Sequence, residues 1–286
     1  MCKALTGLTV AEFESLLVDF SWNYQEYESK RKPDRQRKLG GGAHGTLKSM
    51  EEKFFYGLFY LKTYPTFDVA SFYVGFARSK SCEWAHRLFP ILEQTLKRKL
   101  LLPQRKISDP AEFMRLFPEI KEVFGDGVER VSQRPKKRKS AQKTYSGKKK
   151  LHTRKSVVIV DKRRKVLILT KQKSGRRHDK RLADKEHLFT SLPEEIDLFV
   201  DTGFQGVAKL HHNTYIPKKR RKGKLLTADD KEMNRLISSY RVVVEHAIGG
   251  IKRYRSVSEK LRNRKAWIDD TFMLLSAGLW NYHLSS

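Results

Sequence analysis

The chain has 286 residues, of which 60 are Lys or Arg and 32 are Asp or Glu, so its formal net charge is +28. An apolar share of 39% with 16 Phe, 11 Tyr and 4 Trp is enough for a folded core, which excludes a disordered basic tail. No apolar run reaches the roughly 18 residues of a membrane helix, and two cysteines are too few for a disulfide framework. We therefore expect a soluble intracellular protein whose partner is nucleic acid.

The N-terminal third has the pattern of helices. Thr9 and Glu12 have the spacing of a capping box, and apolar residues follow at helical intervals. Further helices are predicted over 47–63, 67–74 and 80–96. The turn Gly75–Ser79 before the last of these is typical of a helix-turn-helix. A helical bundle with no role in DNA binding has the same periodicity and stays open as the alternative.

These helices divide the first part of the chain into two expected domains. Residues 1–45 are predicted to form an N-terminal helix and a basic, glycine-rich linker, and residues 46–103 a helix-turn-helix domain that binds DNA. We expect base recognition by residues near the start of the third helix of this domain: Ser81, Glu83 and Arg87.

Most of the excess positive charge lies in one stretch. Residues 131–180 hold twenty Lys or Arg against two acids, Asp161 and Asp179. Apolar strand-like runs interrupt the basic segments, which favours a folded phosphate-binding face over a solvated, mobile surface. Within it Lys148, Lys149 and Lys150 stand beside Tyr145 and are expected to contact DNA phosphates.

The remainder of the chain, residues 104–286, alternates between strand and helix patterns and is expected to form one domain. Strands are predicted at residues 123–126, 156–160, 165–170 and 196–200, and helices at 227–252 and 266–283. Strands followed by late helices indicate the α/β or α+β class.

Three carboxylates stand out by position. Asp126 and Asp201 each come directly after an apolar strand-like run, and Glu245 lies in the long predicted helix at the border of its apolar stripe. Side chains at the ends of neighbouring strands converge, so we expect a site of three acids. Without His or Cys such a site suits Mg²⁺ or Mn²⁺, and phosphodiester chemistry uses two such ions. A single Asp after a strand is, by contrast, more often a turn residue.

Several short motifs, in order along the chain, resemble those of the DDE-type transposases of bacterial insertion sequences, in the group called insertion-sequence family five, related to Harbinger endonucleases. The resemblance covers about residues 47–283. It rests on Asp126–Arg130, Arg134-Pro135, Tyr145–Lys150, His152-Thr153, His178-Asp179, Asp201–Gly206, Ile216–Lys219, Asn234-Arg235 and the spacing of Arg241, Glu245 and Lys252.

The resemblance implies an RNase H-like mixed sheet flanked by helices, preceded by an all-α helix-turn-helix domain. It implies Asp126, Asp201 and Glu245 as the catalytic, metal-binding acids. Asp179 is the rival for the second position, but it does not end an apolar run. Arg241, Lys252 and His152 are expected to assist at DNA phosphates.

The function expected from these features is that of a transposase. It would bind the terminal inverted repeats of its element, cleave the ends and join the 3′ hydroxyl to target DNA. Self-association on double-stranded DNA, no membrane contact and a cytoplasmic, nucleoid-associated place in a bacterium are expected with it. The alternative is a non-catalytic, transposase-derived DNA-binding regulator.

Overall fold

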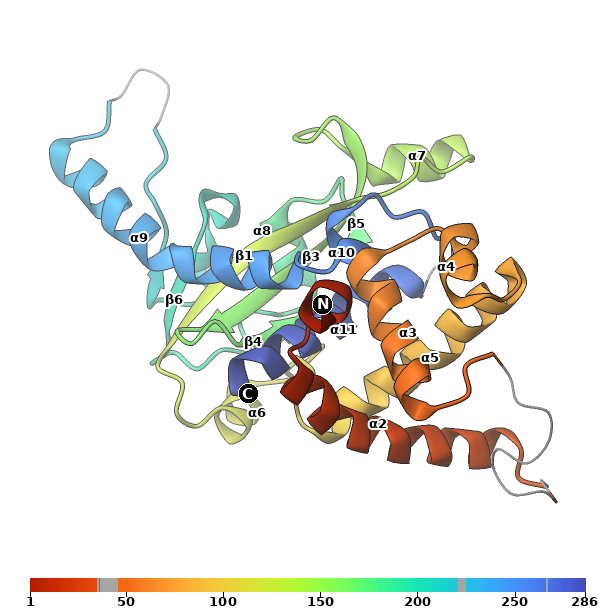
Figure 1. The fold of residues 1–286 in the computed structure, drawn as a ribbon. Coiled ribbons are helices and arrows are strands. Elements are labelled where there is room, and N and C mark those ends of the chain that lie inside the picture. Colours follow the sequence, from red (N-terminus) through yellow and green to blue (C-terminus); the bar gives the residue numbers. More distant parts are fainter. Residues whose placement is uncertain (35, 37–45, 221–224, 266) are drawn as a thin grey trace. The chain divides into compact units, whose positions relative to one another are not determined.

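The computed structural model describes residues 1–34, 36, 46–220, 225–265 and 267–286 (Figure 1). Most of the glycine-rich end of the predicted linker, residues 37–45, falls outside the described residues. The chain divides into two compact units. The first holds residues 1–102, 251–259 and 265–286, and the second holds residues 103–250 and 260–264. Among the described helices, none combines the length and apolar character needed to cross a bilayer.

The first unit is helical. Its elements are α1 (Cys2–Thr6), α2 (Val10–Arg31), α3 (Met50–Thr63), α4 (Phe67–Val74), α5 (Arg78–Arg98), α10 (Arg255–Ser258) and α11 (Ile268–Ser285). The capping box predicted at the start of α2 is confirmed, because Thr9 Oγ1 accepts from the amide of Glu12 while Glu12 accepts from the amide of Thr9. Ser49 and Glu52 cap α3 in the same way.

Aromatic packing fills the core of this unit and brings α11 into it. The ring of Phe272 lies 5.4 Å from that of Phe89 and 6.3 Å from that of Tyr60. The expected bounds of the third domain, 104–286, therefore differ from the compact units at the C-terminal end. α11 packs against α5 within the first unit.

The second unit is built on a mixed sheet. Its elements are α6 (Pro110–Leu116), β1 (Glu122–Val131), α7 (Arg138–Thr144), β2 (Tyr145–Ser146), β3 (Leu151–Asp161), β4 (Val166–Leu169), β5 (Lys173–Ser174), α8 (Asp179–Lys185), β6 (Asp197–Val200), the 3₁₀ turns η1 (Thr202–Phe204) and η2 (Val207–Lys209), β7 (Thr214–Tyr215) and α9 (Ala228–Ile251), whose last residue is counted with the first unit.

Strand pairing is antiparallel on one side of β1 and parallel on the other. The path through the sheet is β2-β3-β1-β6-β7, and β4 and β5 pair with β3. β3 and β4, which contain two of the predicted strands, form a hairpin whose turn is closed by the amide of Lys165 donating to the Asp161 carboxylate. Parallel pairing of β1 with β6 requires a long crossover, which residues 132–196 supply.

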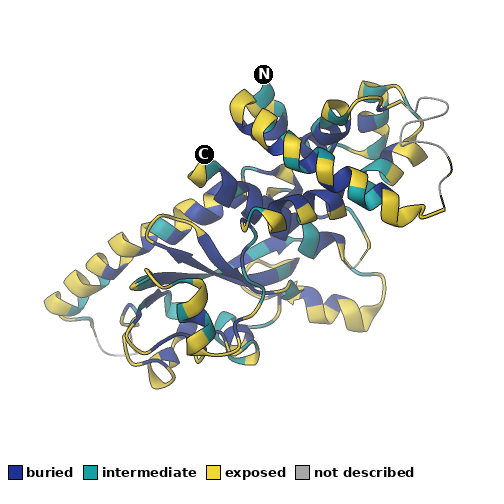
Figure 2. Ribbon diagram, turned by 90° about the horizontal axis from the view of Figure 1, so that it is seen from below, coloured by how far each residue is buried: buried dark blue, intermediate teal, exposed yellow. Residues whose placement is uncertain are grey.

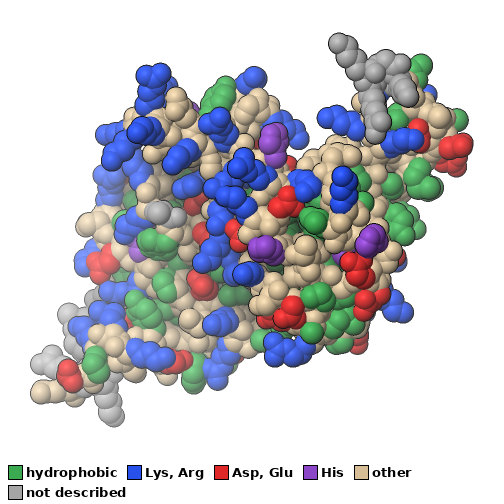
Figure 3. All heavy atoms as spheres, turned by 180° about the vertical axis from the view of Figure 1, so that it is seen from behind, with side chains coloured by type: hydrophobic (Ala, Val, Ile, Leu, Met, Phe, Trp, Pro, Cys, Tyr) green, Lys and Arg blue, Asp and Glu red, His purple; other side chains and the backbone are tan. Residues whose placement is uncertain are grey.

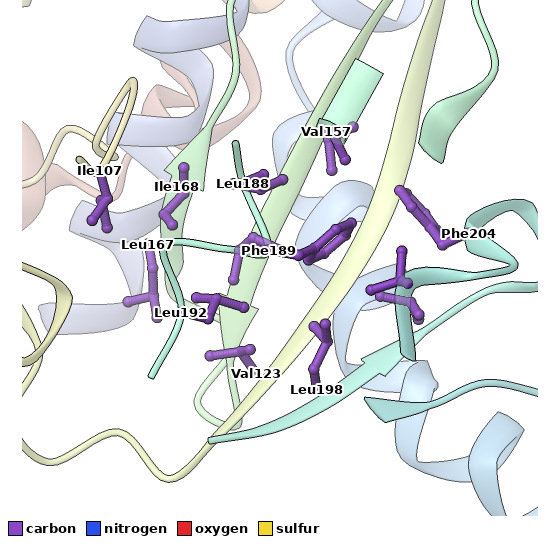
Figure 4. Packing of buried hydrophobic residues seen from close by; sticks show 14 of the residues in the cluster. Ile107, Val123, Val157, Leu167, Ile168, Leu188, Phe189, Leu192, Leu198 and Phe204 are labelled. Carbon is purple, nitrogen blue, oxygen red and sulfur yellow. The ribbon is translucent and has the colours of Figure 1, made fainter. Parts of the chain in front are cut away.

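Buried side chains cover one face of this sheet. Figure 4 shows Val123, Val157 and Leu198 from three strands together with Phe189 and Phe204 from the segments that pack over them. The longer strands are buried along most of their length, while most residues in the first half of α9 are exposed (Figure 2). The sheet is therefore a rigid platform for the residues at its edge.

Candidate active site

Asp126 and Asp201 lie side by side on adjacent parallel strands. Gly125 of β1 is in register with Val200, the last residue of β6, so Asp126 on β1 and Asp201 directly after β6 occupy the next position. The expectation that their strands are neighbours is confirmed. β1 does not end at Asp126 as predicted, however: it continues to Val131, because β3 pairs with it along this whole length.

Arg241 of α9 connects the two carboxylates. Its guanidinium Nη2 lies 3.5 Å from Oδ2 of Asp126, and its Nη1 lies 3.5 Å from Oδ1 of Asp201. The side chain of Arg241 is 10% exposed, and its helix is anchored by the predicted apolar stripe, of which Val244 is fully buried. One buried cation therefore reduces the repulsion between two neighbouring acids.

Burial dominates the electrostatics of Asp126. Loss of solvent raises its pKa above the ordinary value of an aspartate, while the hydrogen bond from the Gly127 amide and the charge of Arg241 act in the opposite direction. The neighbouring carboxylates of Asp201 and Asp179 raise the pKa of Asp126 further. The Gly127 amide donates to Asp126 Oδ1 at 2.6 Å, which fixes the orientation of the carboxylate.

A family model described as "DDE superfamily endonuclease" matches residues 125–281, beginning one residue before Asp126. The probable transposase for insertion sequence element IS702 from Microchaete diplosiphon is 30% identical over 258 residues, which are 90% of this chain and 86% of that protein. The chain belongs to the DDE-type insertion-sequence transposases. No solved structure matches this transposase.

A third carboxylate, Asp179, lies within the same site of the transposase. A Cβ on Gly127 would lie 2.5 Å from Oδ1 of Asp179, and a Cβ on Gly203 would lie 3.4 Å from its Oδ2. Lys155 of β3 is its partner, with Nζ 3.1 Å from the same Oδ1. Asp179 is the first residue of α8, where a carboxylate is favoured by the helix dipole.

Glu245 and Lys252 are exposed and are not part of this cluster of acids. Glu245 is exposed on α9, one turn after Arg241. Lys252 is exposed and follows the last residue of α9, in the part of the chain that packs with the first unit. Their predicted roles stay predictions.

The donor chemistry at the site fits a hard divalent cation in part. Asp126 and Asp201 present carboxylate oxygens to one shared positive group, and the buried Oδ1 of Asp179 has the ion pair with Lys155 but no hydrogen bond. Carboxylate oxygens are the ligands that Mg²⁺ and Mn²⁺ prefer. Among the described residues no three His, Cys, Asp or Glu are already arranged to hold a metal ion.

The predicted phosphate-contacting residues are in the β2–β3 turn. Lys148, Lys149 and Lys150 are exposed, and the amide of Lys150 donates to the Ser146 carbonyl to close the turn. Lys148 and His152 line a groove that also contains Asp179. Their contact with DNA stays a prediction.

The residues expected to read bases have different surroundings on α5. Ser81 is fully buried, and its hydroxyl lies 2.6 Å from Tyr56 Oη, so the expectation that it faces DNA is wrong. Glu83 is exposed, while Arg87 is 20% exposed, pairs with Glu83 at 3.0 Å and stacks over Trp84. Glu83 and Arg87 therefore lie on one face of α5, and their contact with DNA stays a prediction.

Three further residues at the site were not predicted from the sequence: Gly127, Lys155 and Gly203. Lys155 follows Arg154 and stands two residues before the apolar run of β3, and its side chain is 9% exposed where it pairs with Asp179. Each glycine closely follows one of the two aspartates, in Asp126-Gly127 and Asp201-Thr202-Gly203. The presence of a glycine within two residues of each aspartate was the available signal that another group packs against both motifs.

Proposed function

We propose that this protein is the catalytic transposase of its element. It binds the terminal inverted repeats, cuts at the element's ends and joins the freed 3′ hydroxyl to target DNA. The observation that carries the proposal is the pairing of Asp126 and Asp201 on adjacent strands with Arg241 between them. A partly buried pair of adjacent acids at a basic surface costs stability and would serve no purpose in a protein that only binds DNA.

Asp126 and Asp201 would hold Mg²⁺ or Mn²⁺, with Glu245 as a further ligand that has to approach them. Two such ions, when bound, supply charge stabilisation for the attacking and leaving oxygens of an in-line displacement. Arg241 keeps both carboxylates oriented and reduces their mutual repulsion, and Lys155 pairs with Asp179, so that a phosphate approaching the site meets less negative charge. Lys252 would contact phosphates near the cut.

The surrounding architecture supports this function. The mixed sheet with helices is compatible with the RNase H-like core that the family resemblance implies, and α4 and α5 have the length and turn of a helix-turn-helix. Lys and Arg side chains are spread over the face drawn in Figure 3, as a DNA-binding surface requires. Association of several copies on DNA and a place at the bacterial nucleoid belong to the same proposal.

The test is cleavage of DNA that carries the ends flanking this reading frame, in Mg²⁺. Asp126→Asn and Asp201→Asn are each expected to abolish cleavage while end binding stays equal or becomes tighter, because negative charge near phosphate is removed. Asp197→Asn, at the other end of β6, is the matched control and should cleave like the wild type. Cleavage that survives in both site variants would exclude this mechanism. Specific end binding without any cleavage by the wild type would instead favour a DNA-binding regulator.

A further inference from the structure

A groove of about 1200 Å³ begins at the acid cluster and runs along the second unit. Asp179 and Gly203 form its end beside the aspartates, and its walls come from α7, the β2–β3 turn and residues 175–178. All of its described lining residues belong to one compact unit, so the groove is a feature of the sheet unit alone.

The groove is positively charged. Six Lys or Arg side chains and one carboxylate are among its described lining residues. Lys155 is paired with that carboxylate, Asp179. The other five have no ion-pair partner within the described part of the chain: Arg134, Arg138, Lys148, Arg176 and Arg177. Unpaired cations that converge on one groove favour a polyanionic ligand.

An aromatic side chain is placed among these cations. Tyr145 is 41% exposed although it lines the groove, and its ring lies 5.6 Å from that of His152 on the paired strand. His152 is held in turn by its Nδ1 atom, 3.1 Å from Thr144 Oγ1. A tyrosine supported from one side and exposed on another offers a ring surface on which a planar base can stack.

The size of the groove limits the form of the nucleic acid. Pockets of roughly 300–1000 Å³ enclose small organic ligands, so a groove slightly above this range accommodates only a few nucleotides. A cationic track combined with an aromatic ring is the arrangement that binds single strands, because bases of an intact duplex are stacked on one another and not available to the protein.

We propose that this groove holds a few nucleotides of a single DNA strand next to the acid cluster, with one unpaired base stacked on Tyr145. The inference rests on the proposed function, since that function brings a strand end to Asp126 and Asp201. Arg138, Lys148 and Arg176 contact the phosphates of this strand, and its terminal nucleotide reaches Asp179 and Gly203.

The experiment measures binding of short oligonucleotides without divalent metal, so that no cleavage is needed. An oligothymidylate of eight nucleotides is compared with the same backbone lacking its bases. Tyr145→Ala is expected to weaken binding of the oligothymidylate by roughly 5- to 150-fold, the effect of one lost stacked base, and to leave the abasic strand unaffected. Tyr145→Phe keeps the ring and is expected to bind like the wild type.

Tyr215→Ala is the matched control, because Tyr215 has the same 41% exposure in the same unit but lies outside the groove lining. Equal losses on base-bearing and abasic strands, or unchanged binding of the oligothymidylate by Tyr145→Ala, would overturn the proposal. The two proposals can fail separately. If the protein never cleaves its ends but still binds bases through Tyr145, the proposal for the groove holds and the catalytic function is excluded.

Discussion

Gly127 and Asp179, 52 positions apart in the sequence, are packed so closely that a Cβ on Gly127 would lie 2.5 Å from Oδ1 and 2.8 Å from Cγ of the aspartate. Gly203 borders the same carboxylate from the neighbouring strand end, where its Cβ would lie 3.4 Å from Oδ2. The glycines of both motifs thus leave space for a third acid beside Asp126 and Asp201. Lys155 holds that acid in place.

Replacing Gly127 by Ala is expected to lower the free energy of unfolding by about 1–3 kcal/mol, the usual cost of overpacking. Chemical denaturation measures it, and Gly147→Ala, where nothing lies within 4 Å, is the control. In an Asp179→Ala background the same glycine substitution should cost clearly less, because the clashing carboxylate is gone. Additive effects of the two substitutions would contradict the packing relationship.

Replacing Arg241 by Met retains the packing of its stem but removes the cation that Asp126 and Asp201 share. In metal-free buffer the melting temperature is expected to fall, because two neighbouring carboxylates then repel each other without compensation. Added Mg²⁺ should raise the melting temperature of this variant more than that of the wild type. Arg115→Met, which removes an exposed arginine of the same unit, serves as control. If Mg²⁺ raises the melting temperature of the wild type, Arg241→Met and Arg115→Met equally, Asp126 and Asp201 do not bind the metal.

Ser81→Ala tests the buried position of this residue. Loss of its hydrogen bond with Tyr56 is expected to cost about 1 kcal/mol of stability, since the Tyr56 hydroxyl still has the Ser81 carbonyl at 2.9 Å. The preference for the element's own ends over random duplex should stay unchanged. The exposed Ser79→Ala is the control for stability. Reduced end preference in Ser81→Ala would mean that α5 is oriented differently on DNA.

His86 makes the stability of the helical unit depend on pH. Burial and the positive charge of Lys265, whose Nζ lies 3.2 Å from Nδ1, lower the pKa of His86 below its ordinary value of 6.5. The unfolded chain therefore binds the proton more readily, and the stabilising contribution, present above pH 6.5, is lost as the pH falls towards the folded-state pKa. Lys265→Gln should raise the pKa of His86 in an NMR titration and flatten this decline. An unchanged pKa in that variant would rule out the electrostatic coupling.

Neutralising Lys148, Lys149 and Lys150 to Gln should weaken binding to all duplexes alike. Each phosphate contact contributes about 0.9 to the slope of log affinity against log salt, because forming it releases counterions from the DNA. Loss of three contacts should therefore flatten this slope by up to about 3. Lys162, Arg163 and Arg164, exposed at the other end of β3, provide a control triple substitution. An equal change of slope in both proteins would indicate a non-specific effect of net charge.

Elements fixed by neighbouring residues could be predicted from the sequence. The capping box at Thr9 and the β3–β4 hairpin depend on residues within a few positions of each other. The aspartates could be found as well, since each stands directly after a run of apolar residues that must be buried in a sheet. Helix periodicity placed Arg241 and Val244 on α9, and both are buried there.

Only the tertiary structure decided which of these residues meet. Asp179 became part of the site because the chain between β3 and β6 folds back over β1, whereas Glu245, at the spacing typical of the family, is exposed. Ser81 faces Tyr56 rather than solvent because α3 covers that side of α5, and α11 joins the helical unit because its aromatic face fits there. Helix caps, turns and hydrophobic periodicity reflect the conformational preferences of residues close together in the sequence. Which segment buries a given helix or sheet face is decided instead by packing between segments far apart in the chain.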